Sequence, residues 1–306
     1  MDDLPAGVCI GDARHMDAIE NESVTLVITS PPYNVNLEYE AGQTFDEWLS
    51  MIEAVLKECD RVMIDGGRAC INIAATGRKP YKPMYKHVID ISESLGWWMR
   101  GTALWIKGVS SSSTAWGSWR SASNPEFRDN HEFILMFNKG KNSICPGITR
   151  VGVEEFMEIT NAEWYFSPES AKSVGHPAPF PDELPRRCIT LLSNEGDVVL
   201  DPFGGSATTL KVANLLKRRG IIYELNEKYI PIIRKRLEEP LQIQCKGYER
   251  DLAIKRNFPD LCDKSTRELL EIAKKAGIRK CSAMKRIDLM RAITGKSKQP
   301  SLDDFS

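Results

Sequence analysis

Val24–Asn34 reads Val-Thr-Leu-Val-Ile-Thr-Ser-Pro-Pro-Tyr-Asn, an apolar run followed by two consecutive prolines. Far downstream, Val198–Thr209 reads Val-Val-Leu-Asp-Pro-Phe-Gly-Gly-Ser-Ala-Thr-Thr, an apolar run followed by a pair of glycines. Short apolar runs bounded by turn-forming residues are typical of buried strands. Because proline and glycine shape tight turns with little side-chain bulk, we expect each strand to end in a loop that a bound molecule approaches closely.

The remainder of the chain alternates between strand-like and helix-like patterns, which predicts the α/β class. Helical periodicity is present in residues 45–64, 184–192 and 209–216. Strand-like apolar runs occupy residues 24–28, 69–73, 103–106, 133–137, 198–200 and 220–225. Strands that alternate with helices favour a largely parallel sheet covered on both faces. Residues 108–130 and 139–178 lack a sustained period, so we expect long irregular segments there.

The composition limits the classes of protein to which this chain can belong. Its 306 residues leave room for one sizeable α/β domain and a small second unit. No run of about 18 apolar residues is present, and Met1–Leu4 lacks the basic and apolar parts of a signal peptide. The eight cysteines include no Cys-x-x-Cys pair, which favours reduced thiols over disulfides or a zinc site. We therefore expect a cytoplasmic protein without membrane contact or a bound metal.

The net charge of −1 hides an uneven distribution of charged residues. Residues 263–298 contain eleven Lys or Arg residues against four Asp or Glu residues, a local charge of +7. Residues 299–306 contribute −2, which leaves −6 for residues 1–262. A basic segment attached to an acidic body suggests a polyanionic partner for that segment. A solvated helical face rich in lysine is the alternative.

The two proline- and glycine-containing loops together resemble the catalytic and cofactor loops of DNA amino-methyltransferases that use S-adenosylmethionine. Asp201–Thr209 is similar to the Asp-Pro-Phe-x-Gly-Ser-Gly-Thr-Thr loop of that family, with Ala207 in place of a glycine. Ser30–Tyr33 is similar to the family's catalytic loop, in which Asp, Asn or Ser precedes Pro-Pro-Tyr or Pro-Pro-Phe. The catalytic loop comes first here, which is the circular order of the family's β-group. The resemblance covers roughly residues 8–235 and implies a Rossmann-like, circularly permuted methyltransferase sheet.

Several residues are expected to hold the cofactor. A glycine turn before a helix suits a nucleotide-like ligand, and Glu224 ends the next strand, where a carboxylate can accept hydrogen bonds from both ribose hydroxyls. The resemblance implies that Asp12 contacts the adenine ring and that His176–Pro181 completes the pocket around the methionine part. The expected cofactor-binding residues are Asp12, His176, Pro177, Phe180, Asp201, Phe203, Gly204, Gly205, Ser206 and Glu224. A tight turn beside a surface acid is the alternative for either feature alone.

The Ser-Pro-Pro-Tyr loop offers the groups that methylation of a base amino group requires. The amino lone pair is delocalised into the base, so acceptors on its two hydrogens are needed to make the nitrogen nucleophilic. The Ser30 hydroxyl can supply one acceptor and the Pro31 carbonyl the other. Pro32 stiffens the loop, and Tyr33 offers a flat face on which a base taken out of the duplex can stack. We expect the amino proton to leave to water or to a base in bulk solvent.

The first residue of this loop bears on the choice of base. In the family, aspartate there goes mostly with adenine and serine mostly with the N4 amino group of cytosine, so Ser30 favours cytosine. We therefore expect a site-specific DNA methyltransferase acting on cytosine N4. Methylation of adenine N6 is the alternative with the same chemistry, and RNA is an alternative substrate. A catalytically idle nucleic-acid-binding protein of the same fold is the alternative of another class.

Two regions of the main domain are expected to contact double-stranded DNA. The stretch from Trp105 to Leu135 resembles the cytosine-type members of the family, and within it Trp116, Trp119 and Arg120 are candidates to stack on or clamp DNA. Packing of this loop by its own tryptophans is the alternative. Residues from about 141 to 175 correspond to the target-recognition insert of the β-group. This insert is short, which suggests a small target sequence or help from elsewhere in the chain.

The basic C-terminal segment predicts a small helical DNA-binding module. Ser265–Glu268 has the pattern of a capping box that opens an amphipathic helix ending at Gly277, and a second helix is expected to end at Gly295. The segment resembles a SAP or helix-extended-helix module. The expected phosphate contacts are Lys274, Lys275, Arg279, Lys280, Lys285 and Arg286. A helical hairpin that packs on the body or dimerises is the alternative.

These predictions divide the chain into three parts. Residues 1–240 are expected to form the methyltransferase domain, residues 241–262 a connector and residues 263–298 the basic module. The resemblance implies double-stranded DNA as the partner, with a cognate restriction enzyme and a homodimer as further possibilities. It also implies a bacterial, archaeal or phage source.

Overall fold

The computed structural model describes residues 4–34, 42–76, 80–108, 118, 120–127, 129–140 and 147–295. The chain divides into two compact units. The first, named here the sheet unit, consists of Met1–Arg150 and Asn161–Gln244. The second, named the helical unit, consists of Val151–Thr160 and Cys245–Ser306. Each unit has a hydrophobic core of its own.

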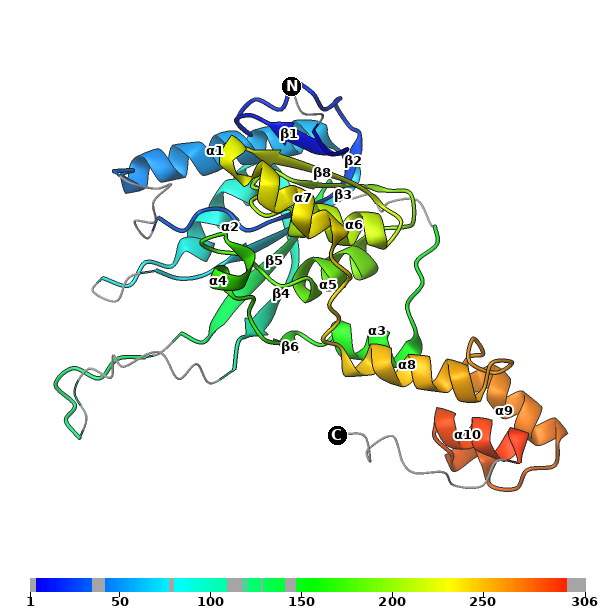
Figure 1. Cartoon of the computed structure of the whole chain (residues 1–306). Helices are drawn as coiled ribbons and strands as arrows, with labels where there is room; N and C mark the ends of the chain where they lie inside the picture. Colours follow the sequence, from blue (N-terminus) through cyan, green and yellow to red (C-terminus); the bar gives the residue numbers. More distant parts are fainter. Residues whose placement is uncertain are drawn as a thin grey trace. The chain divides into compact units, whose positions relative to one another are not determined.

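One mixed sheet is the framework of the sheet unit (Figure 1). In the part of the chain that the structure describes, eight strands lie in the order β1-β8-β7-β2-β3-β5-β4-β6. The strands are β1 (Val8–Ile10), β2 (Val24–Thr29), β3 (Met63–Ile73), β4 (Trp97–Ile106), β5 (His131–Lys139), β6 (Glu163–Tyr165), β7 (Val198–Asp201) and β8 (Arg219–Glu224). Strand β5 is antiparallel to β3 and β4, and the other neighbouring pairs are parallel. The α/β class and the largely parallel sheet predicted from the sequence are confirmed, with one reversed strand inside the sheet.

The order of the strands creates a ligand-binding position between β2 and β7. From β2 the sheet continues through β3, and from β7 it continues in the opposite direction through β8. The two strands are parallel neighbours, with Leu26 opposite Val199 and Val27 opposite Leu200. In open α/β sheets, ligands bind at the carboxyl ends of strands where the order reverses in this way. Both loops that the sequence singled out leave the sheet at this point.

Helices cover both faces of the sheet (Figure 1). Helices α1 and α2 pack on one face, where Val27 joins their core cluster. Helices α5 and α6 pack on the other, where Leu26 and Ile28 join a second cluster, because successive strand residues point to opposite faces. The helices of this unit are α1 (Phe45–Val62), α2 (Met84–Ser94), α4 (Ala171–Val174), α5 (Glu183–Leu192), α6 (Thr208–Leu215), the 3₁₀ helix η2 (Glu227–Tyr229) and α7 (Ile230–Glu238).

Several boundaries differ from those expected. Helix α1 ends at Val62 and Met63 already belongs to β3, so the helix gives way to a strand without a loop. Its expected end was residue 64, because apolar residues at this junction fit either element. Strands β1 and β6 are three residues long each, too short to show a period. Helices α2 and α7 are also additions to the expected elements.

The helical unit contains four helices and a short 3₁₀ helix within the described residues: α3 (Val153–Ile159), α8 (Lys246–Asn257), α9 (Thr266–Lys275), η3 (Cys281–Ala283) and α10 (Arg286–Thr294). The predicted capping box is present at α9. The Ser265 hydroxyl accepts a hydrogen bond from the Glu268 N–H, and the Glu268 carboxylate accepts one from the Ser265 N–H. No helix in the described ranges is both long and apolar enough to cross a membrane.

Helix α8 lies within residues 241–262, where we expected a connector. Ile254 at 3% exposure and Phe258 at 6% belong to the core of the helical unit, together with residues of α9 and α10. This helix also packs against α3. The Asp251 carboxylate accepts hydrogen bonds from the N–H groups of Glu154 and Glu155, at 3.3 and 2.8 Å. Part of the expected target-recognition insert and the basic C-terminal helices therefore form one body.

Candidate functional site

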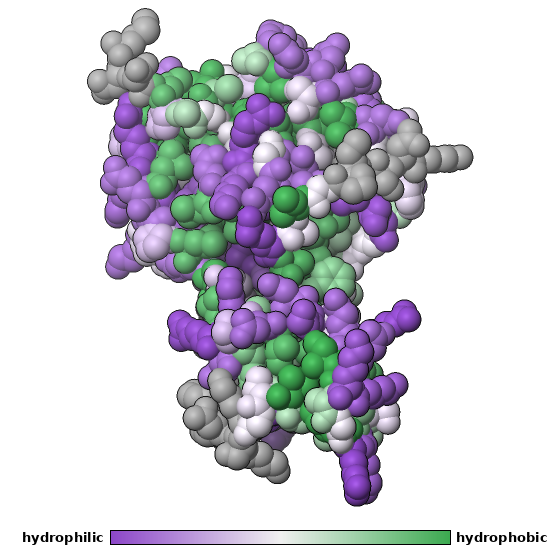
Figure 2. All heavy atoms as spheres, turned by 90° about the vertical axis from the view of Figure 1, so that its right-hand side faces the viewer, coloured by the Kyte–Doolittle hydropathy of each residue, from purple (hydrophilic) through white to green (hydrophobic). Residues whose placement is uncertain are grey.

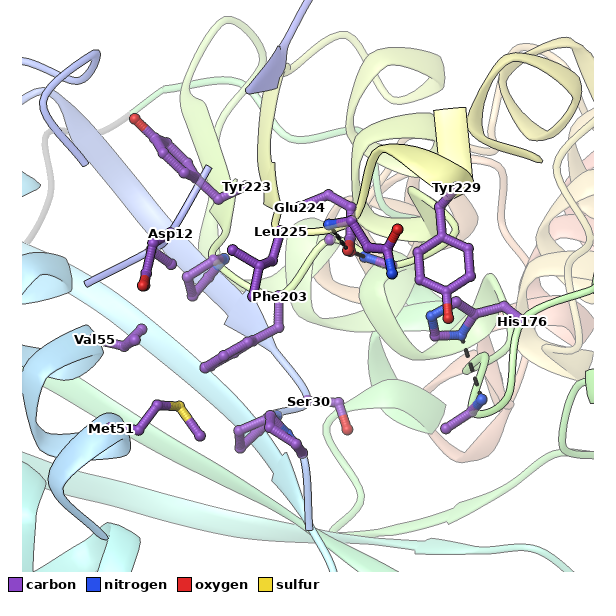
Figure 3. Close-up of a pocket in the computed structure, with 18 of the residues that line it drawn as sticks. Asp12, Ser30, Met51, Val55, His176, Phe203, Tyr223, Glu224, Leu225 and Tyr229 are labelled. Carbon is purple, nitrogen blue, oxygen red and sulfur yellow. Dashed lines mark hydrogen bonds between the residues drawn. The ribbon is translucent and has the colours of Figure 1, made fainter. Parts of the chain in front are cut away.

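A cavity of about 900 Å³ opens where β2, β7 and β8 end. It brings together Ser30–Tyr33, Pro202–Ser206 and Glu224–Glu227, three segments that are far apart in the sequence. In the close-up of Figure 3, one end of the cavity is formed by Asp12, Met51 and Val55 and the other by His176 and Tyr229, and between them lie Phe203, Glu224 and Ser30. The two loops expected from the sequence thus face a common space.

Asp201 stands at the end of β7 but is not among the residues that line the cavity. Its side chain is 1% exposed, and its carboxylate accepts hydrogen bonds from Thr29 Oγ1 (2.9 Å), Thr209 Oγ1 (2.7 Å) and the Phe203 N–H (3.0 Å). Burial raises the pKa of Asp201 to about 6, and these hydrogen bonds oppose that rise. The expected contact between Asp201 and a cofactor is corrected accordingly: the residue ties the end of β2 to the loop and helix after β7.

The turn after Asp201 needs small residues for two different reasons. The Gly204 N–H donates to the Tyr223 carbonyl at 2.7 Å, and a Cβ on Gly204 would lie 2.7 Å from the Cβ of Ile222, so a side chain there would collide with β8. Ala207, at the position where the family has glycine, has φ 62° and ψ 29°. A left-handed alanine costs about 1–2 kcal/mol, which its buried methyl group offsets by roughly 0.8 kcal/mol. The family's glycine is thus explained by backbone conformation rather than by size.

Glu224 reaches the middle of the cavity from the end of β8 (Figure 3). Its two carboxylate oxygens accept hydrogen bonds from the N–H groups of Gly205 and Asn226, each at 2.8 Å. Burial raises the pKa of Glu224, and the backbone hydrogen bonds counteract that rise. Because an ionised carboxylate has about four acceptor positions, the fixed side chain keeps capacity for hydroxyl groups of a ligand.

Asp12 lies at one end of the cavity, beside Arg14. The Arg14 Nε lies 3.0 and 2.9 Å from the two Asp12 oxygens, and the Arg14 backbone N–H donates to Oδ1 at 2.9 Å. Hydrogen bonding to Arg14 lowers the pKa of Asp12. Phe203 and two α1 residues, Met51 and Val55, supply apolar surface next to this carboxylate. A flat ring with polar groups at its edge suits such surroundings.

His176 lies at the other end of the cavity, with its ring 4.7 Å from that of Tyr229. Burial lowers the pKa of His176 to about 4, so the imidazole is neutral at pH 7. Its Nδ1 accepts a hydrogen bond from the Ala178 N–H at 3.3 Å. The proton is therefore on Nε2, which makes this atom a donor. Phe180 also lines the cavity, whereas the expected residue Pro177 does not belong to its lining.

The Ser-Pro-Pro-Tyr loop lines the cavity beside β2. Trp48 of α1 donates its indole N–H to the Pro32 carbonyl at 2.6 Å, which holds the loop on that helix. The Ser30 Oγ lies 2.9 Å from the Tyr33 Oη. The loop is thus fixed in two ways, by a helix that packs against it and by a hydrogen bond within it.

A polar cluster behind this loop consists of the buried residues Asn72 and Glu132 and the partly exposed Lys107. The sequence marked none of them as catalytic, although Lys107 and Glu132 lie in the stretch that resembles the cytosine-type members. The Asn72 Nδ2 lies 2.6 Å from Glu132 Oε2, 2.9 Å from Tyr33 Oη and 3.2 Å from Ser30 Oγ. The Tyr33 hydroxyl donates to Glu132 Oε2 at 3.1 Å, and Lys107 forms an ion pair with Oε1. The available signal was a polar residue within or beside an apolar run: Asn72 lies in 69–73, and Glu132 precedes 133–137.

A profile of the N6 and N4 DNA methylase family matches residues 24–235, which is more than half of the chain. The chain belongs to this family. The type II methyltransferase M.MjaI of Methanocaldococcus jannaschii is 32% identical to it over 275 residues, which cover 75% of this chain and 90% of the relative. The type II methyltransferase M.HpaI of Haemophilus parainfluenzae is 28% identical over 274 residues, which cover 84% of this chain and 80% of the relative.

Solved structures of DNA methylases share the fold of this methyltransferase. TTHA0409 of Thermus thermophilus, assigned to the DNA modification methylases and solved with S-adenosyl-L-methionine, has a TM-score of 0.62 and 27% identity, covering 78% of this chain and 98% of that one. The cytosine-N4-specific PvuII DNA methyltransferase has a TM-score of 0.61 and 21% identity, and the match covers 81% of this chain and 91% of that one. The PvuII comparison supports the fold alone, because the identity is low.

Outside the cavity, the methyltransferase has an exposed set of basic residues on its helical unit. These are Lys274, Lys275, Arg279, Lys280 and Lys285. Figure 2 shows hydrophilic side chains projecting from this unit around a group of hydrophobic ones. Arg286 departs from the expectation of a phosphate contact, because its guanidinium donates to the backbone carbonyls of Cys262 and Lys264. It braces the chain before α9.

The remaining candidates for DNA contact lie on the loop between β4 and β5. Trp116 and Trp119 are outside the residues that the structure describes, as are residues 141–146 of the expected insert. Arg120 is exposed, with φ 59°. The loop leaves the sheet at the end of β4, which is parallel to β2 through the intervening strands, so it starts at the same edge as Ser30.

Proposed function

We propose that this methyltransferase transfers a methyl group from S-adenosylmethionine to the N4 amino group of cytosine at a specific site in double-stranded DNA. The observation that carries the choice of base is Ser30, a neutral hydroxyl that lines the cavity at the first position of the Pro-Pro-Tyr loop. In the family, serine at this position goes mostly with cytosine N4. Relatives from Methanocaldococcus jannaschii and Haemophilus parainfluenzae favour a cytoplasmic enzyme of a prokaryote.

The lining of the cavity suits S-adenosylmethionine in one orientation, with its adenine ring near Asp12 and its methionine part near His176. Asp12 would accept a hydrogen bond from the adenine amino group, while Phe203 packs on the ring. Glu224 would accept from both ribose hydroxyls, and the neutral His176 would donate from Nε2 to the carboxylate of the methionine part. When bound, the cofactor supplies a methyl group on a positively charged sulfur. A volume of about 900 Å³ is within the usual range for such ligands.

The chain's own contribution to the chemistry is to prepare the base. Ser30 Oγ and the Pro31 carbonyl accept hydrogen bonds from the two N–H groups of the amino group, which moves the nitrogen lone pair out of conjugation and toward the cofactor. Tyr33 stacks on the base after it has left the duplex. Because serine is neutral, it stabilises the developing positive charge less than an aspartate would, and the proton leaves to water.

The modified base is the direct test of this proposal. We expect 4-methylcytosine after incubation of double-stranded DNA with the protein and labelled cofactor, as measured by nucleoside mass spectrometry of the digested DNA. Finding 6-methyladenine instead would show that Ser30 does not indicate the base. Label in neither nucleoside, with RNA of the same sequence also unlabelled, would favour the idle binding protein over an enzyme.

The helical unit is proposed to read and hold DNA as one body. Helix α3, from the expected target-recognition insert, packs on α8, and α8 shares a core with the basic helices α9 and α10. The segment that reads the sequence and the lysines that bind the DNA backbone would then belong to one compact unit and approach DNA together. This proposal redraws the expected boundary, since the basic module includes residues from 245 onward and 151–160. A restriction enzyme that cuts the same unmethylated site belongs to the proposal, supported by the type II names of the relatives.

Replacing Lys274, Lys275 and Lys285 by alanine should weaken DNA binding equally for all sequences. The slope of log K against log salt is negative, and each lost phosphate contact reduces its magnitude by about 0.9, so the magnitude should fall by up to roughly 3. Fluorescence anisotropy at several salt concentrations measures both quantities. The matched control replaces Lys57, Lys86 and Lys217, exposed lysines of the sheet unit. Equal slopes for the two triple variants would assign the basic helices to packing or dimerisation instead.

A further inference from the structure

We propose that Glu132 is a positioning residue, which sets the direction of a hydrogen-bond chain and thereby makes Ser30 an acceptor rather than a donor toward the target amino group. This inference rests on the proposed role of Ser30. A serine hydroxyl can either donate or accept, whereas activation of the amino group requires an acceptor. Something in the protein must therefore fix which way the Ser30 proton points.

The ionised carboxylate of Glu132 fixes the first link, because it can only accept. Lys107 occupies Oε1. Oε2 accepts one hydrogen bond from Asn72 Nδ2 at 2.6 Å and keeps a second acceptor position for the loop. The Tyr33 hydroxyl lies 3.1 Å from Oε2 and 3.4 Å from the backbone carbonyl of Asn72. The shorter distance and the negative charge both favour Glu132 as the acceptor of the Tyr33 proton.

The second link follows from the first. Tyr33 has one proton, and with that proton committed to Glu132 its oxygen can only accept. Ser30 Oγ is 2.9 Å away, so the Ser30 proton points to Tyr33 and away from the cavity. The Asn72 Nδ2 donates into the same cluster, at 2.9 Å from Tyr33 Oη and 3.2 Å from Ser30 Oγ. The remaining lone pair of Ser30 is then presented to the amino hydrogen of the base.

Burial makes this direction persistent. Asn72 is 2% exposed and Glu132 is 7% exposed, so water competes little for their hydrogen bonds. Lys107 compensates the buried negative charge. The cluster therefore gives a neutral serine the acceptor character that an aspartate at the same position would have without assistance.

The variant Glu132→Gln tests the direction of the chain. Glutamine has one acceptor, the amide oxygen, and one donor, the amide NH₂, at its end. The ammonium of Lys107 can only donate, so it pairs with the amide oxygen. The amide NH₂ would then face Tyr33 and reverse the chain, so that Ser30 offers a proton to the amino group. We expect kcat for methyl transfer to fall by about 10- to 100-fold, with the Kd for S-adenosylmethionine unchanged. The assay counts labelled methyl groups in DNA and does not depend on which base is modified.

The double variant Lys107→Met/Glu132→Gln separates direction from simple damage. Without Lys107 the amide can turn its oxygen toward Tyr33 and Asn72, which restores the direction, so kcat should recover at least severalfold above that of Glu132→Gln. Tyr33→Phe removes the middle link while keeping the ring, and should lower kcat as well. The matched control is Glu53→Gln, since Glu53 forms an ion pair with Lys57 on the exposed face of α1, away from the cavity lining. It should leave kcat unchanged.

Three outcomes would overturn the inference: wild-type turnover in Glu132→Gln, wild-type turnover in Tyr33→Phe, or a double variant no faster than Glu132→Gln. If Glu132→Gln fails to fold, as judged by circular dichroism, Tyr33→Phe decides alone. Ser30→Ala is measured in parallel. A fast Ser30→Ala variant would refute the proposed role of Ser30 itself, whereas a slow Ser30→Ala variant beside fast Glu132→Gln and Tyr33→Phe variants would refute the role of Glu132 alone.

Discussion

Ser30→Ala is expected to lower kcat by about 100- to 1,000-fold, the usual loss when one positioned hydrogen-bond partner of a reacting group is removed. The physical reason is that alanine offers no acceptor to the amino hydrogen, so the nitrogen lone pair stays delocalised in the base. The Kd for S-adenosylmethionine should change little, because Glu224, Asp12 and His176 are proposed to hold the cofactor. Single-turnover methylation and calorimetry measure the two quantities separately.

The control for this variant is Ser23→Ala, which changes a serine just before the opposite end of β2. The Ser23 hydroxyl donates to the Glu20 carbonyl at 2.7 Å, away from the cavity, so turnover should stay at the wild-type rate. A folded Ser30→Ala protein that methylates DNA as fast as the wild type would remove Ser30 from the chemistry. Loss of turnover together with a large loss of cofactor affinity would instead place Ser30 at the cofactor.

Glu224→Ala is expected to weaken S-adenosylmethionine binding by about 1–3 kcal/mol, a roughly 5- to 150-fold rise in Kd. The substitution removes the proposed acceptor of the ribose hydroxyls. It also releases the Gly205 N–H from its 2.8 Å hydrogen bond, so the cofactor loop loses one of its ties to β8. Calorimetric titration with the cofactor gives the affinity, and thermal unfolding without it shows whether the loop change affects the fold.

Glu227→Ala is the matched control for Glu224. Glu227 is an exposed acid that lines the same cavity from the short 3₁₀ helix η2. If the ribose is held by Glu224 specifically, the control should bind the cofactor within about twofold of wild type. Equal losses in both variants would indicate a general electrostatic effect of acids around the cavity, and no loss in a folded Glu224→Ala protein would exclude Glu224 from the site.

Local pattern in the sequence was sufficient to predict β2, β7 and β8, whose ends form the middle of the cavity, but not β1 or η2, which also border it. A run such as Val24–Ile28, which is short and rich in β-branched residues, favours a buried strand, and the segments that follow β2 and β7 contain proline and glycine. The strand order that brings the two loops together, with β2 beside β7, was not predicted from these runs. The family resemblance supplied the cofactor and the catalytic loop, which local pattern alone leaves open.

Features that depend on partners distant in the sequence could not be predicted in this way. Asp201 was expected at the cofactor because it stands beside the loop, yet Thr29 and Thr209 bind its carboxylate in the interior. Arg286 was counted with the exposed basic residues, yet two backbone carbonyls bind it. Asn72 and Glu132 meet only because β3 and β5 are antiparallel neighbours, a direction that the apolar runs do not encode. Helix α8 was missed because it contains few apolar residues, so its sequence shows no clear helical period. Its buried residue Ile254 lies in a core that α9 and α10 complete.

The buried carboxylate of Asp201 has a consequence for engineering. By accepting hydrogen bonds from Thr29 and Thr209, it joins the residue before Ser30 to the start of α6. The catalytic and cofactor loops are therefore held together by shared hydrogen bonds to one carboxylate, although about 170 residues separate them in the chain. A chimera that exchanges either loop with a relative has to carry Thr29, Asp201 and Thr209 as one set. The helical unit, which is proposed to read and hold DNA, contains none of these three residues.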